Sequence, residues 1–290
     1  IEPRAALLAE LLRTGGYDLL YMNNQPASNQ EGYVAAVQAG LPVVQHCRTE
    51  PKLSTQEVAL VNRAASRVIC VSSGVRDKLV ARGVDAARLS VVYNAIDGRA
   101  ELPAAATAPA GDGLVIGSVG QLVARKATGD LLRALAILHG ERRPLRCVIL
   151  GEGPQRAELE ELARSLGIAA QVHFMGFQAQ PLAFIQSMDL FVICSPSEGL
   201  PRVVLEAMLA QKPVIGSDVT GTRELVLPEQ NGLLYPYGDV PALSAALRRL
   251  MDDAALRRRM GAAGRARVLA EFSMQGYVDG ISEVLTGALR

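Results

Sequence analysis

Residues 189–218 constrain the fold of this chain more than any other stretch of its sequence. They begin with a continuous apolar run, residues 190–194, whose length and β-branched content are typical of a strand buried on both faces. A turn with Glu198 follows, and Pro201 suits the first position of a helix that is expected to end near Gln211. Another apolar strand comes next. This order predicts a parallel sheet with the turn at the carboxyl end of its strand, where such sheets bind ligands.

Glu206 is the one polar residue in the middle of this predicted helix, since every other residue of 203–210 is apolar. A helix that is apolar all round is buried, so its carboxylate needs a partner or a ligand. One interpretation is an ion pair with Arg202, although the arginine precedes the glutamate, which is the weaker orientation. The other is that Glu206 points into a cleft and accepts hydrogen bonds from ligand hydroxyls. The sequence alone leaves both interpretations open.

Glu198 and Glu206 are separated by seven residues within the pattern S-x-x-E-G-L-P-x-V-x-L-E-A-M-x-A-x-K-P-V-I-G-S. This pattern resembles the donor-binding motif of the retaining GT-B glycosyltransferases of family four. The resemblance implies an α/β fold with two Rossmann-like, doubly wound domains that face a cleft. It also implies that Glu198 contacts the transferred sugar and that Glu206 holds the ribose hydroxyls. The backbone around the sugar and the phosphates would come from Gly199, Leu200 and Pro201.

Two adjacent cations, Arg125 and Lys126, precede a helix that is expected over residues 129–139. Positive charge is unfavourable at a helix amino terminus unless an anion binds there, and a solvated loop is the alternative interpretation. In the family the matching loop, which starts here at Gly120, supplies a lysine to the diphosphate, so Lys126 is implied in that role. Gln121 departs from the arginine that many members have there, and Arg125 is the candidate to replace it.

His46 and Phe174 complete the implied site. His46 directly follows a strand expected at 41–45, and a lone histidine at a strand end is more often structural. In the family, however, a histidine after the equivalent strand reaches the donor sugar, so His46 is a candidate site residue. Phe174 belongs to the strand and loop of 172–177, which in the family borders the nucleobase. Arg48, close to His46, is a candidate to face acidic groups of an acceptor.

The chain is expected to form two domains joined by a linker. Alternating helices and strands over residues 1–98 predict an N-terminal, acceptor-side Rossmann-like domain. Compared with the family this domain lacks its first strands and Gly-rich loop, so it is expected to be truncated. Residues 99–112 are rich in Ala and Pro and are expected to be the linker. Residues 113–270 would bind the nucleotide sugar, and 271–290 would form a helix that returns to the first domain.

Composition and charge argue against several other classes of protein. The net charge of +1 argues against a dedicated nucleic-acid binder, and no apolar run approaches the roughly 18 residues of a membrane span. The four cysteines lie mostly in or beside apolar runs without a C-x-x-C pattern. They are expected to be reduced core residues of a cytoplasmic protein rather than disulfides or zinc ligands.

The resemblance implies transfer of a sugar from a nucleotide diphosphate sugar, with UDP or GDP as the nucleotide, to an acceptor hydroxyl with retention of configuration. Glu198, His46 and Lys126 would be the catalytic residues, and no cofactor or metal ion is expected because no D-x-D motif ends a strand. The expected acceptor is a glycan or glycolipid of bacterial surface polysaccharide. The alternatives are a sugar phosphorylase of the same fold and a non-catalytic nucleotide-sugar-binding fragment.

A basic run over residues 257–267 raises the question of association with the inner face of the membrane. Basic helices of this kind can bind anionic lipid. More often they are solvated faces whose charge is balanced by nearby acidic residues, here Asp252, Asp253 and Glu271. The solvated face is the favoured interpretation, and peripheral membrane association is the other.

Overall fold

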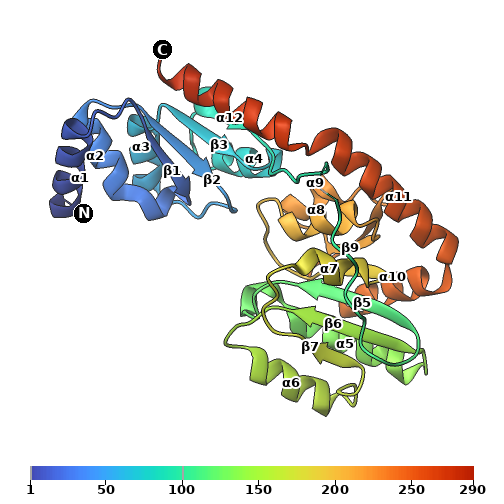
Figure 1. Cartoon of the computed structure of the whole chain (residues 1–290). Coiled ribbons are helices and arrows are strands. Elements are labelled where there is room, and N and C mark those ends of the chain that lie inside the picture. Colours follow the sequence, from blue (N-terminus) through green and yellow to red (C-terminus); the bar gives the residue numbers. More distant parts are fainter. Residues whose placement is uncertain (1, 100) are drawn as a thin grey trace. The chain divides into compact units, whose positions relative to one another are not determined.

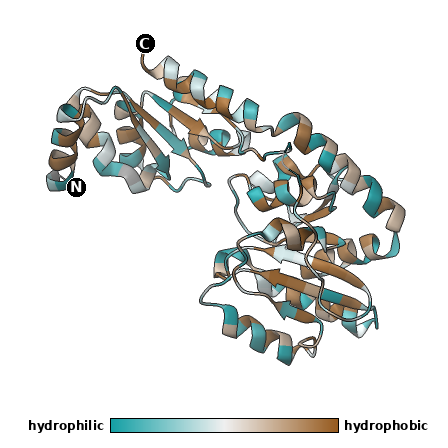
Figure 2. Ribbon diagram, viewed as in Figure 1, coloured by the Kyte–Doolittle hydropathy of each residue, from teal (hydrophilic) through white to brown (hydrophobic). Residues whose placement is uncertain are grey.

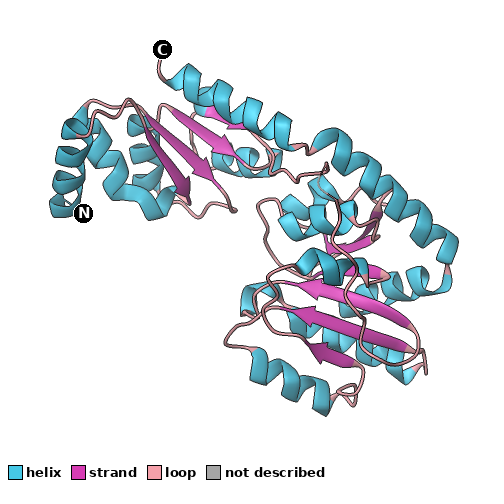
Figure 3. Ribbon diagram, viewed as in Figure 1, coloured by secondary structure: helices cyan, strands magenta, loops and turns pink. Residues whose placement is uncertain are grey.

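The computed structural model describes residues 2–99 and 101–290, which fall into two compact units (Figure 1). Unit 1 contains the chain up to Ala95 together with Met274–Arg290, and unit 2 contains Ile96–Ser273. Each unit has a sheet whose strand pairs are all parallel, flanked by helices (Figure 3). The strands are mostly hydrophobic, whereas the helices alternate hydrophobic and hydrophilic residues (Figure 2). This pattern is what a sheet buried beneath helices requires.

The sheet of unit 1 has four strands in the order β1-β2-β3-β4. The strands are β1 (Leu20–Asn24), β2 (Val43–Cys47), β3 (Arg67–Cys70) and β4 (Leu89–Val91). The helices of this unit are α1 (Glu2–Thr14), η1 (Pro26–Asn29), α2 (Gln30–Ala39), α3 (Thr55–Ala64), α4 (Ser73–Ala81), η2 (Ala86–Arg88) and α12 (Met274–Ala288). Ser72 caps α4, because its hydroxyl accepts a hydrogen bond from the Val75 N–H at 3.1 Å.

The last helix of the chain, α12, packs on the sheet of unit 1. Val284 lies in one buried cluster with Val44 of β2, Ile69 of β3 and Val92. Gly280 allows close contact, since a Cβ atom there would lie 3.1 Å from Val92. The amino-terminal and carboxyl-terminal segments of the chain therefore share one hydrophobic core.

The sheet of unit 2 has six strands in the order β10-β9-β8-β5-β6-β7. The strands are β5 (Leu114–Val119), β6 (Leu145–Leu150), β7 (Val172–Phe174), β8 (Leu190–Ile193), β9 (Val214–Ser217) and β10 (Gly232–Tyr235). The helices are η3 (Ala124–Lys126), α5 (Thr128–Gly140), α6 (Arg156–Ser165), α7 (Pro181–Gln186), α8 (Arg202–Leu209), α9 (Thr220–Leu225), α10 (Val240–Asp252) and α11 (Ala254–Glu271). After β5 the chain adds β6 and β7 on one side of this strand. It then returns to place β8 on the other side of β5 and adds β9 and β10 beyond β8, so the strand order reverses between β5 and β8.

The strand–turn–helix–strand unit predicted at residues 189–218 is present as β8, α8 and β9, with different helix ends. Pro201 is not the first helical residue but the N-cap, with an extended ψ of 112°. The helix stops at Leu209 rather than Gln211, which has a φ of +57°. Helix ends are the least determined part of a sequence pattern because frayed turns and caps resemble each other.

The four cysteines are free and buried, which confirms the prediction that they are core residues. They are Cys47, Cys70, Cys147 and Cys194. Burial raises the pKa of all four thiols, which keeps them protonated. Within the described part of the chain, no helix combines the length and the apolar character needed to cross a membrane.

The basic run of α11 is not a simple solvated face. Arg257, Arg265 and Arg267 donate hydrogen bonds to main-chain carbonyl oxygens of Leu250, Leu209 and Leu225 at 2.5, 2.9 and 2.6 Å. These three guanidinium groups hold α11 against its neighbours in unit 2. The sequence pattern could not reveal this, because the three carbonyl groups belong to other elements.

Candidate functional site

A narrow cavity opens at the carboxyl ends of β5 and β8, where the strand order of unit 2 reverses. Its lining includes Gly120, Lys126, Thr128, Cys194 and Ser195. Open parallel sheets bind ligands at this kind of position because the loops after the two strands diverge and leave a crevice. The topology therefore selects this cavity as the candidate site.

Lys126, which lines this cavity, forms an ion pair with Glu198 from the opposite loop. Lys126 comes from the loop after β5 and Glu198 from the loop after β8, and the Lys126 Nζ lies 2.5 Å from the Glu198 Oε1. Only 19% of the lysine side chain and 11% of the glutamate side chain are exposed. The sequence singles out both residues for ligand binding, and the structure brings them together.

The loop that carries Glu198 is held by tight backbone contacts. The Glu198 carbonyl oxygen accepts a hydrogen bond from the Gly221 N–H at 3.2 Å. A Cβ atom at Gly221 would lie 2.4 Å from the Gly199 carbonyl oxygen, so only glycine fits there. Leu200 and Pro201 are buried and lead directly into α8. The first turn of α8 therefore begins at a fixed point beside Glu198, and helix starts of this kind present N–H groups that bind anions.

Glu206 lies in the second turn of α8, and its Oε2 atom is buried without a hydrogen-bond partner. Arg202 is exposed, and no ion pair between Arg202 and Glu206 forms in the described structure. Burial raises the pKa of Glu206, and the nearby charge of Arg202 lowers it by less. A buried carboxylate oxygen without a partner is costly, which favours the interpretation that a ligand supplies its hydrogen bonds.

Because the pKa of Glu206 is raised, the free energy of unfolding is expected to depend on pH through this group. Its ordinary pKa is 4.5, so the folded chain binds this proton more tightly than the unfolded chain, and stability from this group is lost as pH rises above about 4.5. As pH rises from 5 to 8, we expect Glu206→Gln to gain stability relative to wild type, because the wild-type carboxylate must ionise in a desolvated place. Urea denaturation at both pH values measures this difference. A pH-independent difference would show that Glu206 is not desolvated.

Arg125 and Phe174 occupy less distinctive surroundings. Arg125 is exposed, and its Nη2 lies 3.4 Å from the Oε1 of Gln121, which is also exposed. The side chain of Phe174, the last residue of β7, packs on the core of unit 2, and its carbonyl oxygen accepts a hydrogen bond from Arg156 at 3.2 Å. β7 ends at Phe174 and a loop follows, in agreement with the strand and loop predicted over residues 172–177.

His46 lies inside β2 and not after it, which corrects the placement expected from the sequence. Its side chain is fully buried, with Nδ1 at 2.5 Å from the Tyr21 hydroxyl and the Tyr277 ring of α12 stacked at 6.4 Å between centroids. Burial lowers the pKa of His46 to about 3, so the imidazole is neutral at physiological pH. Its Nε2 atom is buried without a partner. His46 belongs to unit 1, whereas the other candidate site residues belong to unit 2.

Arg48 joins four parts of unit 1. Its guanidinium donates to the Asn23 and Asn94 side-chain oxygens at 2.7 and 2.8 Å and to the Tyr277 hydroxyl at 3.1 Å. These acceptors belong to β1, the segment after β4, and α12. These hydrogen bonds give Arg48 a structural role in unit 1, and its contact with an acidic acceptor stays a prediction.

Two buried hydroxyl groups of unit 2 were missed by the sequence analysis. Ser195 lines the cavity, and its Oγ has no hydrogen-bond partner, while its carbonyl oxygen accepts from the Ser217 hydroxyl at 2.6 Å. Thr222 of α9 also has a buried hydroxyl without a partner. For Ser195 the sequence does carry a signal, because this serine directly follows the apolar run of residues 190–194.

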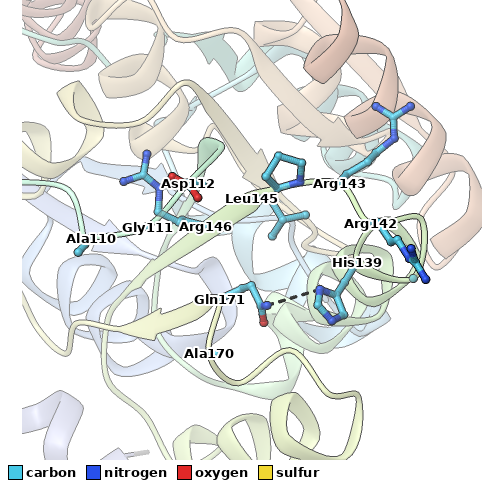
Figure 4. Close-up of a pocket in the computed structure, with 12 residues that line it drawn as sticks. Ala110, Gly111, Asp112, His139, Arg142, Arg143, Leu145, Arg146, Ala170 and Gln171 are labelled. Carbon is cyan, nitrogen blue, oxygen red and sulfur yellow. Dashed lines mark hydrogen bonds between the residues drawn. The ribbon is translucent and has the colours of Figure 1, made fainter.

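A larger pocket of about 650 Å³ lies at the opposite end of the sheet, beside the amino ends of β5 and β6 (Figure 4). Some of its polar groups have partners within the protein: Arg146 donates to the Pro109 and Gly113 carbonyl oxygens, and Gln171 lies 3.5 Å from the His139 ring nitrogen. The pocket also meets the carboxyl end of α5, where the helix dipole opposes an anion. Size alone therefore does not make it the nucleotide site.

Two family models together match most of the chain. Residues 103–267 match the model described as glycosyl transferases group 1, and residues 3–98 match the model described as glycosyltransferase family 4. The first match lies in unit 2, and the second lies almost entirely in unit 1. All residues that line the candidate cavity belong to the first match.

Curated proteins with similar sequences include enzymes of lipopolysaccharide synthesis. The lipopolysaccharide core biosynthesis glycosyltransferase LpsD of Rhizobium meliloti is 36% identical over 58% of this chain and 48% of its own length. The lipopolysaccharide 1,6-galactosyltransferase of Salmonella typhimurium is 31% identical over 63% of this chain and 52% of its own length. The chain thus spans about half the length of the curated relatives it matches.

A solved structure with a similar fold is Anabaena Alr3699/HepE in complex with UDP. It is 26% identical in sequence, covers 97% of this chain and 82% of its own, and has a TM-score of 0.85. The same protein has also been solved with UDP-glucose, again with a TM-score of 0.85.

Proposed function

This chain belongs to the group 1 glycosyl transferases, and from that premise we propose that it transfers a sugar from a nucleotide diphosphate sugar to an acceptor hydroxyl. Its fold is the α/β GT-B fold predicted from the sequence, with two Rossmann-like units. The observation that carries the proposal is the cavity at the strand-order reversal of unit 2, which Lys126 lines, together with the ion pair between Lys126 and Glu198.

Lys126, the start of α8, Glu206 and Glu198 would each suit one part of a nucleotide sugar. The ammonium group of Lys126 and the N–H groups at the start of α8 suit a diphosphate, and they would stabilise the negative charge that develops on it during transfer. The partnerless carboxylate oxygen of Glu206 suits ribose hydroxyls, which are hydrogen-bond donors. Glu198, beside Lys126, would then contact the sugar.

We propose that the anomeric configuration is retained. In this scheme the bond between the anomeric carbon and the diphosphate oxygen breaks, the acceptor oxygen bonds the same face of the sugar, and the acceptor proton passes to the departing phosphate. The chain's own residues orient the donor and stabilise the leaving diphosphate, so the scheme assigns no general base. The motif resemblance of Glu198 and Glu206 supports this proposal.

The proposed donor is a UDP-sugar and the proposed acceptor a glycan or glycolipid of a bacterial surface polysaccharide, with transfer in the cytoplasm. The UDP and UDP-glucose complexes of the Anabaena protein support the donor. The names of the relatives from Rhizobium meliloti and Salmonella typhimurium support the acceptor.

The first test is thermal stability with UDP, GDP, TDP and ADP. A nucleotide at 100 times its dissociation constant stabilises the native state by about 2.7 kcal/mol, which raises the melting temperature. We expect UDP to give the largest increase and Glu206→Ala to abolish it. Glu158→Ala removes a carboxylate from the exposed face of α6 and should keep the full increase.

Two results would contradict this proposal. If no nucleotide raises the melting temperature of the folded wild-type chain, the cavity is not a donor site. If Glu206→Ala binds UDP as well as wild type does, the ribose position is wrong.

A further inference from the structure

The Lys126–Glu198 ion pair joins two loops whose backbones are held by separate hydrogen bonds. The Lys126 N–H donates to the Val123 carbonyl oxygen at 2.9 Å, and the lysine side chain runs along Gly120. The Glu198 carbonyl oxygen is held by the Gly221 N–H. The two side chains thus reach each other from the loops after β5 and β8, beside the cavity that Lys126 lines.

A ligand that takes one member of this pair leaves the other without a partner. A diphosphate can replace Glu198 as the partner of Lys126, but the glutamate then keeps its charge in a site where only 11% of its side chain is exposed. Breaking a buried ion pair on one side is strongly unfavourable, and here the freed carboxylate would also lie close to a second anion. Sugar hydroxyls remove this cost, because they donate hydrogen bonds to a carboxylate.

We propose that the Lys126–Glu198 ion pair is a latch that lowers the affinity of the site for a nucleoside diphosphate without a sugar. The complete nucleotide sugar breaks the ion pair at a lower cost in free energy than the nucleoside diphosphate alone, because its diphosphate binds Lys126 while its sugar hydroxyls bind Glu198. After transfer the product diphosphate competes with Glu198 for Lys126, which favours product release. This inference rests on the proposed function, since it requires the donor to occupy this cavity.

Calorimetric titration with UDP tests the latch in four chains: wild type, Glu198→Gln, Lys126→Met and the double variant. The glutamine side chain of Glu198→Gln keeps the shape of the original but carries no charge, so Lys126 is free for the diphosphate. We expect Glu198→Gln to bind UDP about tenfold more tightly than wild type, and this gain to vanish in the Lys126→Met background. UDP-glucose, UDP-galactose and UDP-N-acetylglucosamine are titrated as well. For the nucleotide sugar that binds most tightly, the ratio of its affinity to that of UDP should be smaller in Glu198→Gln than in wild type.

A control separates the latch from simple charge repulsion. Asp130→Asn removes a carboxylate from the first turn of α5 and leaves the latch intact, so UDP affinity should change by less than about twofold. Circular dichroism melting checks that each variant is folded, and Glu198→Ala replaces Glu198→Gln if the latter is not.

The outcomes distinguish failure of the latch from failure of the proposed function. If wild type binds UDP but Glu198→Gln binds it equally or more weakly, the latch is excluded and the donor site stands. A gain that persists with Lys126→Met also excludes the latch, because repulsion alone would then explain it. If wild type binds none of the nucleotides, the proposed function itself fails.

Discussion

A Lys126→Met variant is expected to bind UDP about 10- to 100-fold more weakly than the wild-type chain, because a hydrogen bond to a charged group typically contributes about 1.5–3 kcal/mol. Methionine keeps most of the length and apolar stem of lysine but has neither charge nor donor. In the free variant Glu198 loses the partner that it has at 2.5 Å in wild type. Carboxylate and phosphate charges would then face each other without a cation. Calorimetric titration at a temperature well below the melting transition measures the effect.

Arg133→Met is the matched control for this variant. Arg133 also lies near the beginning of unit 2's first long helix, α5, but it is 52% exposed and pairs with Asp130. Exposed ion pairs contribute little, so UDP affinity should stay within about twofold of wild type. Equal loss in both variants would mean that the binding depends on general positive charge, and no loss with Lys126→Met would place the diphosphate elsewhere.

The elements that the sequence predicts well are those specified by local apolar patterns. Residues 114–119 and 145–150 are mostly apolar runs, and they form the strands β5 and β6. Both runs are followed by glycine-containing turns and then by helices, which favours a buried parallel strand in each case. The αβ alternation and the position of Glu198 after β8 follow from the same local pattern.

The position of His46 shows where such a pattern stops being informative. The apolar run before it ends at Val44, so the sequence predicts that the strand ends at residue 45. In the structure β2 continues to Cys47, because His46 is paired in register with Asn23 of β1 and Ile69 of β3. Neighbouring strands and the Tyr277 ring of α12, more than 200 residues later in the chain, decide that this histidine is buried.

The candidate site shows the same division between local and distant information. Lys126 and Glu198 could each be selected from its own loop, but they are 72 positions apart in the sequence, so the sequence does not show that they form an ion pair. Their contact depends on β5 and β8 being neighbours in the sheet, which is a property of the topology. The ion pair, unlike the motif, is therefore visible only in the structure.

Gly151→Ala is expected to lower the free energy of unfolding of unit 2 by about 3 kcal/mol or more. Gly151 follows β6 directly and has a φ of +133°, a conformation that side chains with a Cβ atom rarely adopt. The added Cβ would also lie 1.9 Å from the carbonyl oxygen of Gly120. The Gly151 N–H donates to the Gly176 carbonyl oxygen at 2.8 Å, so the turn cannot shift without losing a backbone hydrogen bond. Urea denaturation followed by circular dichroism measures the loss.

Gly140→Ala is the control, because its backbone has no positive φ and nothing lies within 4 Å of the added Cβ. It should leave stability unchanged or raise it slightly, since alanine favours the helical conformation at the end of α5. Gly120 lines the cavity beside Lys126, so the molecules of Gly151→Ala that do fold should also bind UDP more weakly. A stable Gly151→Ala chain with wild-type UDP affinity would show that the loop after β5 tolerates displacement, and that its close contact with the turn after β6 does not position the site.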